Sequence, residues 1–165
     1  MNRRIAILLF FFVFERGISQ EFSMLRKPLV YGEIYMDSSV LAQTIESTWT
    51  KITDFTSNGN ARIDYFQDTF WILIPGLYLV EYDLKASSTI NNSEFETGMP
   101  VNGEEPEVKN RGYVKFESPG AIEPVYRSFT KYYEKGDYLV FVMRQTVGVQ
   151  ADVTFRYGNI IIMKL

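Results

Sequence analysis

The sequence predicts an all-β protein, a sandwich, jelly roll or barrel, from its aromatic content and from the spacing of its apolar segments. The 165 residues include 13 Phe, 11 Tyr and 2 Trp, so that 16% are aromatic. Aromatic and β-branched side chains suit the half-buried surface of a sheet. About eight short strand-like segments follow one another at spacings of roughly 8–20 residues, without an amphipathic helix between them. The length fits one domain of about 150 residues.

The first part of this domain, after a polar linker that ends at Pro28, is expected to alternate strands with turns. A strand is indicated where large and polar side chains alternate, and a turn where Asn, Gly, Asp or Ser cluster. These patterns predict, in chain order, a strand at 31–36, a loop at 37–47, a strand at 49–55, a turn at 57–60 and a hairpin over 64–74 that reverses at 67–69.

Pro75-Gly76 marks the start of a further strand over 77–84. In this strand Tyr78, Val80 and Tyr82 share one face, because successive side chains of a strand point to opposite sides. Turn-rich stretches separate it from the remaining predicted strands, which are 125–133, 138–143 and 154–165.

Two of these strands are apolar on both faces for much of their length, namely 77–84 and 138–143. An antiparallel strand of an isolated two-layer sandwich is solvated on one face. The second apolar face is therefore expected to pack on another subunit, which predicts an oligomer. The residues expected in the core or at this subunit interface are Tyr78, Val80, Tyr82, Tyr138, Val140, Phe141 and Tyr157.

Residues 1–28 are expected to form an N-terminal extension to a domain at 29–165. A basic start precedes the apolar run Ile5–Phe14, which is the outline of a signal peptide and is shorter than the about 20 residues of a membrane-spanning helix. The exit from the run lacks a small-x-small cleavage pattern and places charge directly after the run, which argues against cleavage, and a retained segment would dock on a partner. Signal peptide, docking segment and membrane anchor stay as alternatives. The docking residues would be Ile5, Leu8, Leu9, Phe10, Phe11, Phe12 and Phe14.

Composition and charge argue against several functions. The chain has no Cys and no His, so it lacks thiolate metal ligands, a cysteine nucleophile and the commonest acid–base catalyst. The net charge is −3, and residues 1–28 carry five basic and two acidic side chains. The remaining residues are acidic overall, which gives no electrostatic case for a nucleic-acid partner. We expect a non-enzymatic protein without a cofactor or metal.

Two acidic groupings are the candidates for chemistry. The turn at 102–107 clusters three carboxylates beside Asn102, but their spacing is not that of a calcium loop, so a solvated acidic turn is favoured over a calcium site. Glu81 and Asp83 share a strand face and are the carboxylates that a glycosidase would use. A polar outer surface is the favoured interpretation of this pair.

An ordered set of short motifs resembles the C1q/tumour-necrosis-factor-like jelly roll. The motifs are Pro75-Gly76-Leu77-Tyr78, Asn102-Gly103-Glu104, the stretch Gly136-Asp137 with the apolar strand after it, and Tyr157-Gly158 in the last strand. The resemblance covers roughly residues 48–165. It implies an antiparallel ten-strand jelly roll that assembles as a homotrimer around aromatic residues.

The segments 31–35 and 49–52 are also similar to phage-encoded members of this superfamily. The second resemblance implies a virion-surface protein: a head fibre, capsid-decorating or receptor-binding protein. Residues 1–28 would attach it to the capsid or to another virion protein, and a host-surface glycan or receptor is a further candidate partner. The alternative is a secreted, extracellular recognition or adhesion module of the same fold.

Overall fold

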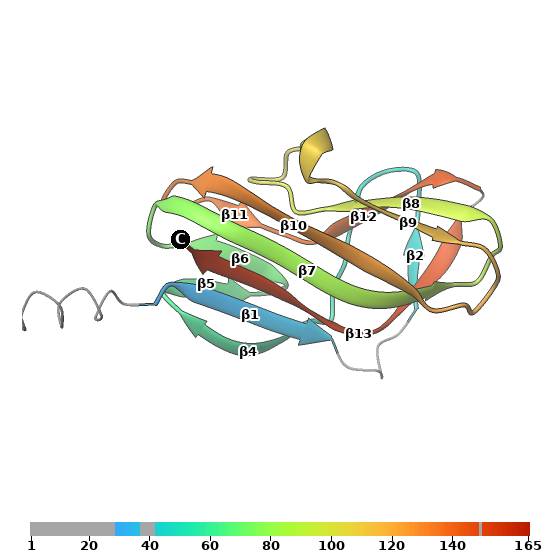
Figure 1. Ribbon diagram of the computed structural model, residues 1–165, viewed down its shortest axis with the longest axis horizontal. Helices are drawn as coiled ribbons and strands as arrows, with labels where there is room; N and C mark the ends of the chain where they lie inside the picture. Colours follow the sequence, from blue (N-terminus) through green and yellow to red (C-terminus); the bar gives the residue numbers. More distant parts are fainter. Residues whose placement is uncertain (1–28, 37–41, 149) are drawn as a thin grey trace, which may run out of the picture.

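The computed structural model describes residues 29–36, 42–148 and 150–165 of the chain (Figure 1). Within these ranges the secondary structure is almost entirely β, with one short 3-10 turn, η1 (Val108–Asn110). The strands are β1 (Tyr31–Met36), β2 (Gln43–Ile45), β3 (Thr50–Lys51), β4 (Thr56–Ala61), β5 (Ile63–Phe66), β6 (Thr69–Ile72), β7 (Gly76–Ser88), β8 (Ser93–Gly98), β9 (Gly112–Phe116), β10 (Glu123–Tyr133), β11 (Tyr138–Leu139), β12 (Val142–Val147) and β13 (Ala151–Lys164).

One layer of the molecule is a six-stranded antiparallel sheet in the order β10-β7-β13-β1-β4, with β2 paired to the start of β13 (Figure 1). The long strands β10, β7 and β13 lie side by side in that order, with β10 at one edge of the sheet, and β13 lies between β7 and β1. Neighbours in space that are distant in sequence are what a jelly roll requires.

The second layer is made of two shorter antiparallel sheets, β11-β6-β5 and β3-β12-β8-β9. Consecutive strands β11 and β12 join the two, with only Val140 and Phe141 between them. The amide of Ile52 donates to the Phe141 carbonyl at this break, at 3.0 Å. The two sheets therefore act as one layer facing the six-stranded sheet.

Aromatic side chains fill the space between the layers. The ring of Phe141 lies at the centre, with ring centroids 5.0 Å from Tyr82 and 6.1 Å from both Phe55 and Phe155. Such edge-to-face pairs each add about 0.5–1.5 kcal/mol beyond the burial of their area. Many of the aromatic side chains that predicted an all-β fold thus form the core.

Several predicted elements are confirmed by these strands. The segment 31–36 is β1, the hairpin reverses at Gln67-Asp68 between β5 and β6, and β7 and β10 contain the predicted strands at 77–84 and 125–133. The alternation predicted for 77–84 is also correct, because Tyr78, Val80 and Tyr82 are fully buried.

Other predicted elements were wrong. Ser57–Asn60, expected as a turn, lies inside β4, because its backbone pairs with β1 although its side chains are exposed. The expected strand at 49–55 is regular only at Thr50-Lys51, and part of the expected loop at 37–47 is strand β2. The expected strand at 138–143 is broken at Val140-Phe141, where pairing passes from β6 to β8. Strands β8 and β9 had no counterpart in the prediction.

The two ends of the described chain lie at the same end of the sandwich (Figure 1). Beside the start of β1, the amide of Lys164 donates to the carbonyl of Val30 at 3.0 Å. The first and the last described residues therefore lie side by side. The turns that follow β7, β9 and β12 lie at the opposite end.

Candidate interface and end pocket

The structure places most of the predicted core or interface residues in the core. Tyr78, Val80 and Tyr82 are fully buried between the layers, and Phe141 is 2% exposed. Tyr138 and Val140 are half-buried, and the ring of Tyr138 packs against Trp71, with centroids 5.1 Å apart. Tyr157 is 55% exposed. Only this last residue of the predicted set projects from the outer face of the six-stranded sheet.

That outer face is the largest open surface of the long strands. Residues that are directly paired across strands share a face, and the registers of β1, β7, β10 and β13 place one set of side chains opposite the core. The set comprises Tyr31, Glu33, Tyr35, Leu77, Leu79, Glu81, Asp83, Lys85, Tyr126, Ser128, Thr130, Tyr132, Tyr157, Asn159, Ile161 and Met163. We call it the outer face.

The outer face combines an apolar centre with exposed tyrosines. Leu79 pairs directly with Met163, and Leu77 pairs with Tyr132, which is 57% exposed. Leu77 itself is 46% exposed. Large contiguous exposed apolar patches are a feature of interaction sites in proteins. The sequence predicted a second apolar face on this strand, to which Leu77 and Leu79 belong. Tyr78, Val80 and Tyr82, expected in the core or at the interface, lie in the core.

A hydrogen-bonded group fixes one charge on the outer face. Glu33 accepts hydrogen bonds from the Tyr31 hydroxyl and from the amides of Asn58 and Asn159, both at 3.2 Å. The bonds from Tyr31 and Asn159 hold the pKa of Glu33 below its usual value. Burial, together with the bond to Glu33, raises the pKa of Tyr31 to about 12.

Most of the carboxylates in the two acidic groupings pair with a basic side chain. In the turn at 102–107, Glu105 pairs with Arg111 at 3.4 Å and Glu107 pairs with Lys109 and Lys131. The described residues contain no group of three or more His, Cys, Asp or Glu side chains placed to hold a metal ion. Glu81 and Asp83 lie on the outer face, and Asp83 is 3.9 Å from Lys85. The carboxylates of this pair are not enclosed in a cleft.

A charged cluster on the second layer was missed by sequence reasoning. Glu96, 9% exposed, accepts from Arg111 at 3.1 Å and from Arg144 at 2.7 Å. Both guanidinium groups lie over the ring of Trp49, at 5.3 and 4.6 Å from its centroid. The carboxylate is thus paired with two cations, and both cations stack on one aromatic ring, so the charges of this cluster are balanced within the layer.

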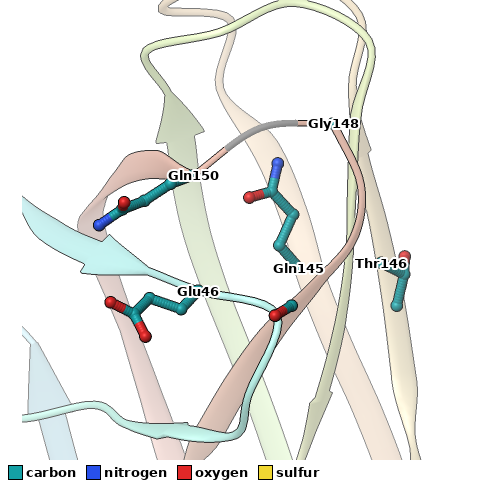
Figure 2. A pocket seen from close by; sticks show the side chains of 6 residues that line it. Glu46, Gln145, Thr146, Gly148 and Gln150 are labelled. Carbon is teal, nitrogen blue, oxygen red and sulfur yellow. The ribbon is translucent and has the colours of Figure 1, made fainter.

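A polar pocket lies at the end of the sandwich remote from the chain termini (Figure 2). Its volume is about 360 Å³, and it is lined by Glu46, Ser47, Gln145, Thr146, Gly148 and Gln150. The lining comes from the residues after β2, the end of β12 and the residue before β13. Glu46 and Ser47 lie about 100 residues before the other lining residues in the sequence, and no local spacing links the two groups.

The predictions made for residues 1–28, including the docking segment Ile5–Phe14, concern a part of the chain outside the described residues. None of the helical structure in the described ranges has the length and hydropathy needed to span a bilayer.

Comparison with solved structures identifies the fold. Murine APRIL at pH 5.0 superposes with a TM-score of 0.59 at 13% identity, covering 82% of this chain and 99% of that chain. Eiger TNF from S. frugiperda gives 0.62 at 12% identity, covering 84% and 94%. The globular domain of the zebrafish complement 1qA protein gives 0.58 at 13% identity, covering 82% and 97%.

The chain has a C1q/TNF-like jelly-roll fold. The resemblance stated from its motifs is confirmed at the level of the fold, and the similarity at 11–13% identity extends no further than that. No known family profile matches the sequence, and no curated protein matches it.

Proposed function

We propose that this chain is a non-enzymatic, homotrimeric virion protein of a phage, a head fibre, capsid-decorating or receptor-binding protein, attached through residues 1–28. The observation that carries the proposal is the outer face, where leucines and tyrosines project from the long strands away from the core. A surface of this kind in a monomer would drive aggregation. Self-association covers it, and the C1q/TNF-like fold is associated with a threefold arrangement.

The energetics favour an assembly that resists dilution. Burying one large apolar side chain stabilises by about 1.5–3 kcal/mol. Leu77, Leu79, Ile161 and Met163 lie together on adjacent strands of the outer face, and the exposed tyrosines surround them. Tyrosine suits such an interface because its ring is buried while its hydroxyl reaches water or a partner.

Both ends of the described chain lie at one end of the sandwich. This arrangement supports attachment to the particle at that end and exposure of the opposite end. The described chain enters beside its last residues, where Leu165 donates its amide to the carbonyl of Leu77 at 2.9 Å. An attachment segment at 1–28 would hold the sandwich by that end. The turns and the polar pocket at the opposite end would then face outward (Figure 1).

The trimer is tested by measuring the mass of the full chain by light scattering. We expect three times the 19.2 kDa chain mass, unchanged on dilution. Leu79→Glu should lower the mass to that of one chain, because it buries a charge in the apolar centre. Val108→Glu is the matched control, since Val108 is 69% exposed and lies outside the outer face. A wild-type mass of one chain contradicts the proposal.

The secreted module is the second candidate, and residues 1–28 separate it from the virion protein. Leu9→Asp or Phe12→Asp should abolish incorporation into the particle while the mass stays that of a trimer, because a docking segment cannot bury a charge without a large cost. A mature N-terminus near residue 20, or a charged variant retained unexported, supports secretion and overturns the virion role. N-terminal sequencing of the mature protein gives the answer.

A further inference from the structure

We propose that the polar pocket at the free end of the sandwich binds a neutral saccharide. The inference rests on the recognition role proposed above and names the ligand of that role. The pocket's volume of about 360 Å³ is in the range of small-molecule sites, which run from about 300 to 1,000 Å³. Its lining differs from that of most such sites, because the side chains that the described residues contribute to it are all polar (Figure 2).

A buried glutamine forms the preorganised part of the site. Gln145 is 6% exposed; its side-chain nitrogen donates to the carbonyl of Val147 at 3.2 Å, and its backbone amide donates to the carbonyl of Glu46 at 2.8 Å. Its side-chain oxygen accepts no hydrogen bond from the described residues, and in Figure 2 it points to the side where Gln150 and Glu46 lie. A ligand hydroxyl that enters the pocket would donate to this oxygen.

The charges of the residues that line the pocket argue against two other ligand classes, anions and divalent cations. No Lys or Arg of residues 29–36, 42–148 and 150–165 lines the pocket, so within this part of the chain a phosphate, sulfate or carboxylate would meet only Glu46 and uncharged groups. A single carboxylate is also too few for a divalent cation, which takes six or more oxygen ligands in the case of calcium. The pocket is built for an uncharged polar molecule.

The hydrogen-bonding groups match a molecule with several hydroxyls. Glu46 and the oxygen of Gln145 accept, the amide of Gln150 both donates and accepts, and the hydroxyl of Thr146 does both. Each hydroxyl of a sugar can likewise donate to one group and accept from another. A site made of such pairs rejects analogues that lack the hydroxyl, because its own polar groups would be left unpaired.

A second hollow extends the site beyond one sugar ring. It has a volume of about 220 Å³, shares Thr146 with the first, and is lined by Glu94, Tyr113 and Lys115 among others. Tyr113 is 63% exposed, so the face of its ring is open to the apolar C–H surface of a second ring. A ligand of two or more rings would pass over Thr146 from one hollow to the other.

The experiment is a screen of the full chain on an array of neutral hexose and N-acetylhexosamine oligosaccharides, followed by calorimetric titration with the strongest binder. Glu46→Gln and Gln150→Ala should each weaken its affinity by tenfold or more. Tyr113→Ala should weaken a disaccharide or longer ligand and leave a monosaccharide unchanged. Glu134→Gln is the matched control, because Glu134 is exposed and precedes the turn at the other end of the sandwich.

The results separate the saccharide site from the trimer. A trimer that binds no neutral saccharide, or binds only anionic ones, overturns the site and leaves the assembly standing. Binding that Glu46→Gln and Gln150→Ala leave unchanged also overturns it. Binding lost in both variants and kept in Glu134→Gln supports the site, and it does so even if light scattering shows a single chain.

Discussion

The hydroxyl of Tyr82 lies 3.0 Å from the hydroxyl of Thr97, and this buried contact joins the two layers of the sandwich. Tyr82 belongs to β7 of the six-stranded sheet, and Thr97 belongs to β8 of the opposite layer. Both residues are fully buried, and burial raises the pKa of Tyr82 to about 12. The core thus contains one satisfied polar link among its aromatic rings.

We expect this link to appear as a coupling energy. Tyr82→Phe and Thr97→Val each leave one hydroxyl without this partner, and each should lower the free energy of unfolding by about 1–3 kcal/mol. The double variant should lose less than the sum, because it removes both hydroxyls together. Urea unfolding at one fixed protomer concentration measures all four proteins. Strict additivity would mean that the two hydroxyls do not interact in solution.

Gly112 makes room for the same pair. A Cβ at this position would lie 2.6 Å from the Thr97 hydroxyl and 2.8 Å from the Tyr82 hydroxyl. Gly112→Ala should therefore destabilise by about 1–3 kcal/mol, as overpacking of a core does. Adding Tyr82→Phe to Gly112→Ala should recover part of this loss in the same urea experiment. A double variant as unstable as the sum of its parts would place the clash elsewhere.

Gly158 allows a close approach between two strands. The register of β13 against β7 shifts between Phe155 and Tyr157, and Gly158 follows with a φ of 142°. A Cβ there would lie 2.2 Å from the carbonyl oxygen of Asp83, which is backbone and cannot swing away. This is the physical reason for the Tyr157-Gly158 motif noted in the sequence.

Gly59 supplies a control with the same backbone angle. Its φ is 143°, and no atom lies within 4 Å of its would-be Cβ. Gly59→Ala should cost only backbone strain, about 1–3 kcal/mol. Gly158→Ala should cause the same backbone strain and should also displace β7. The melting temperature of this variant should therefore fall further than that of Gly59→Ala, or the variant should give no soluble protein. Equal melting temperatures would show that β13 and β7 separate easily.

The strands that could be predicted from sequence are those whose side chains alternate. In β7, buried and more exposed positions alternate with the period of a strand, and polar residues appear on the outer face from Glu81 onward, because only one face meets the core. The strand β4 has no buried side chain to carry such a pattern. It lies at the edge of the sheet and is defined by its backbone pairing with β1, which no local sequence signal records.

Strand β8 and the polar pocket were missed because their partners are distant in sequence. β8 contains one large apolar residue, Phe95, and its buried Glu96 is tolerated because Arg111 and Arg144 meet it from other elements. Glu46, Gln145 and Gln150 converge only after folding. Sequence alternation separates the two faces of β7 but does not say which one meets the core, so the sequence left Tyr78, Val80 and Tyr82 as core or interface residues, and the structure places them in the core.

The hydrogen bonds at Glu33 predict a dependence of stability on pH. The bonds from Tyr31 and Asn159 lower the pKa of Glu33 in the folded protein below its ordinary value of 4.5. The unfolded chain therefore binds this proton at a higher pH than the folded chain does. The contribution to the free energy of unfolding is complete above about pH 4.5 and is lost as the pH falls through the folded pKa.

Glu33→Gln isolates that contribution. The variant keeps the shape of the side chain but has no proton to take up, so its free energy of unfolding should fall less steeply between pH 6 and pH 3 than that of the wild type. Glu123→Gln is the control, because Glu123 has no side-chain hydrogen bond or ion pair within the described part of the chain. Urea unfolding across this pH range gives the slopes. A wild-type slope that Glu33→Gln leaves unchanged would show that the carboxylate is not held by Tyr31 and Asn159 in solution.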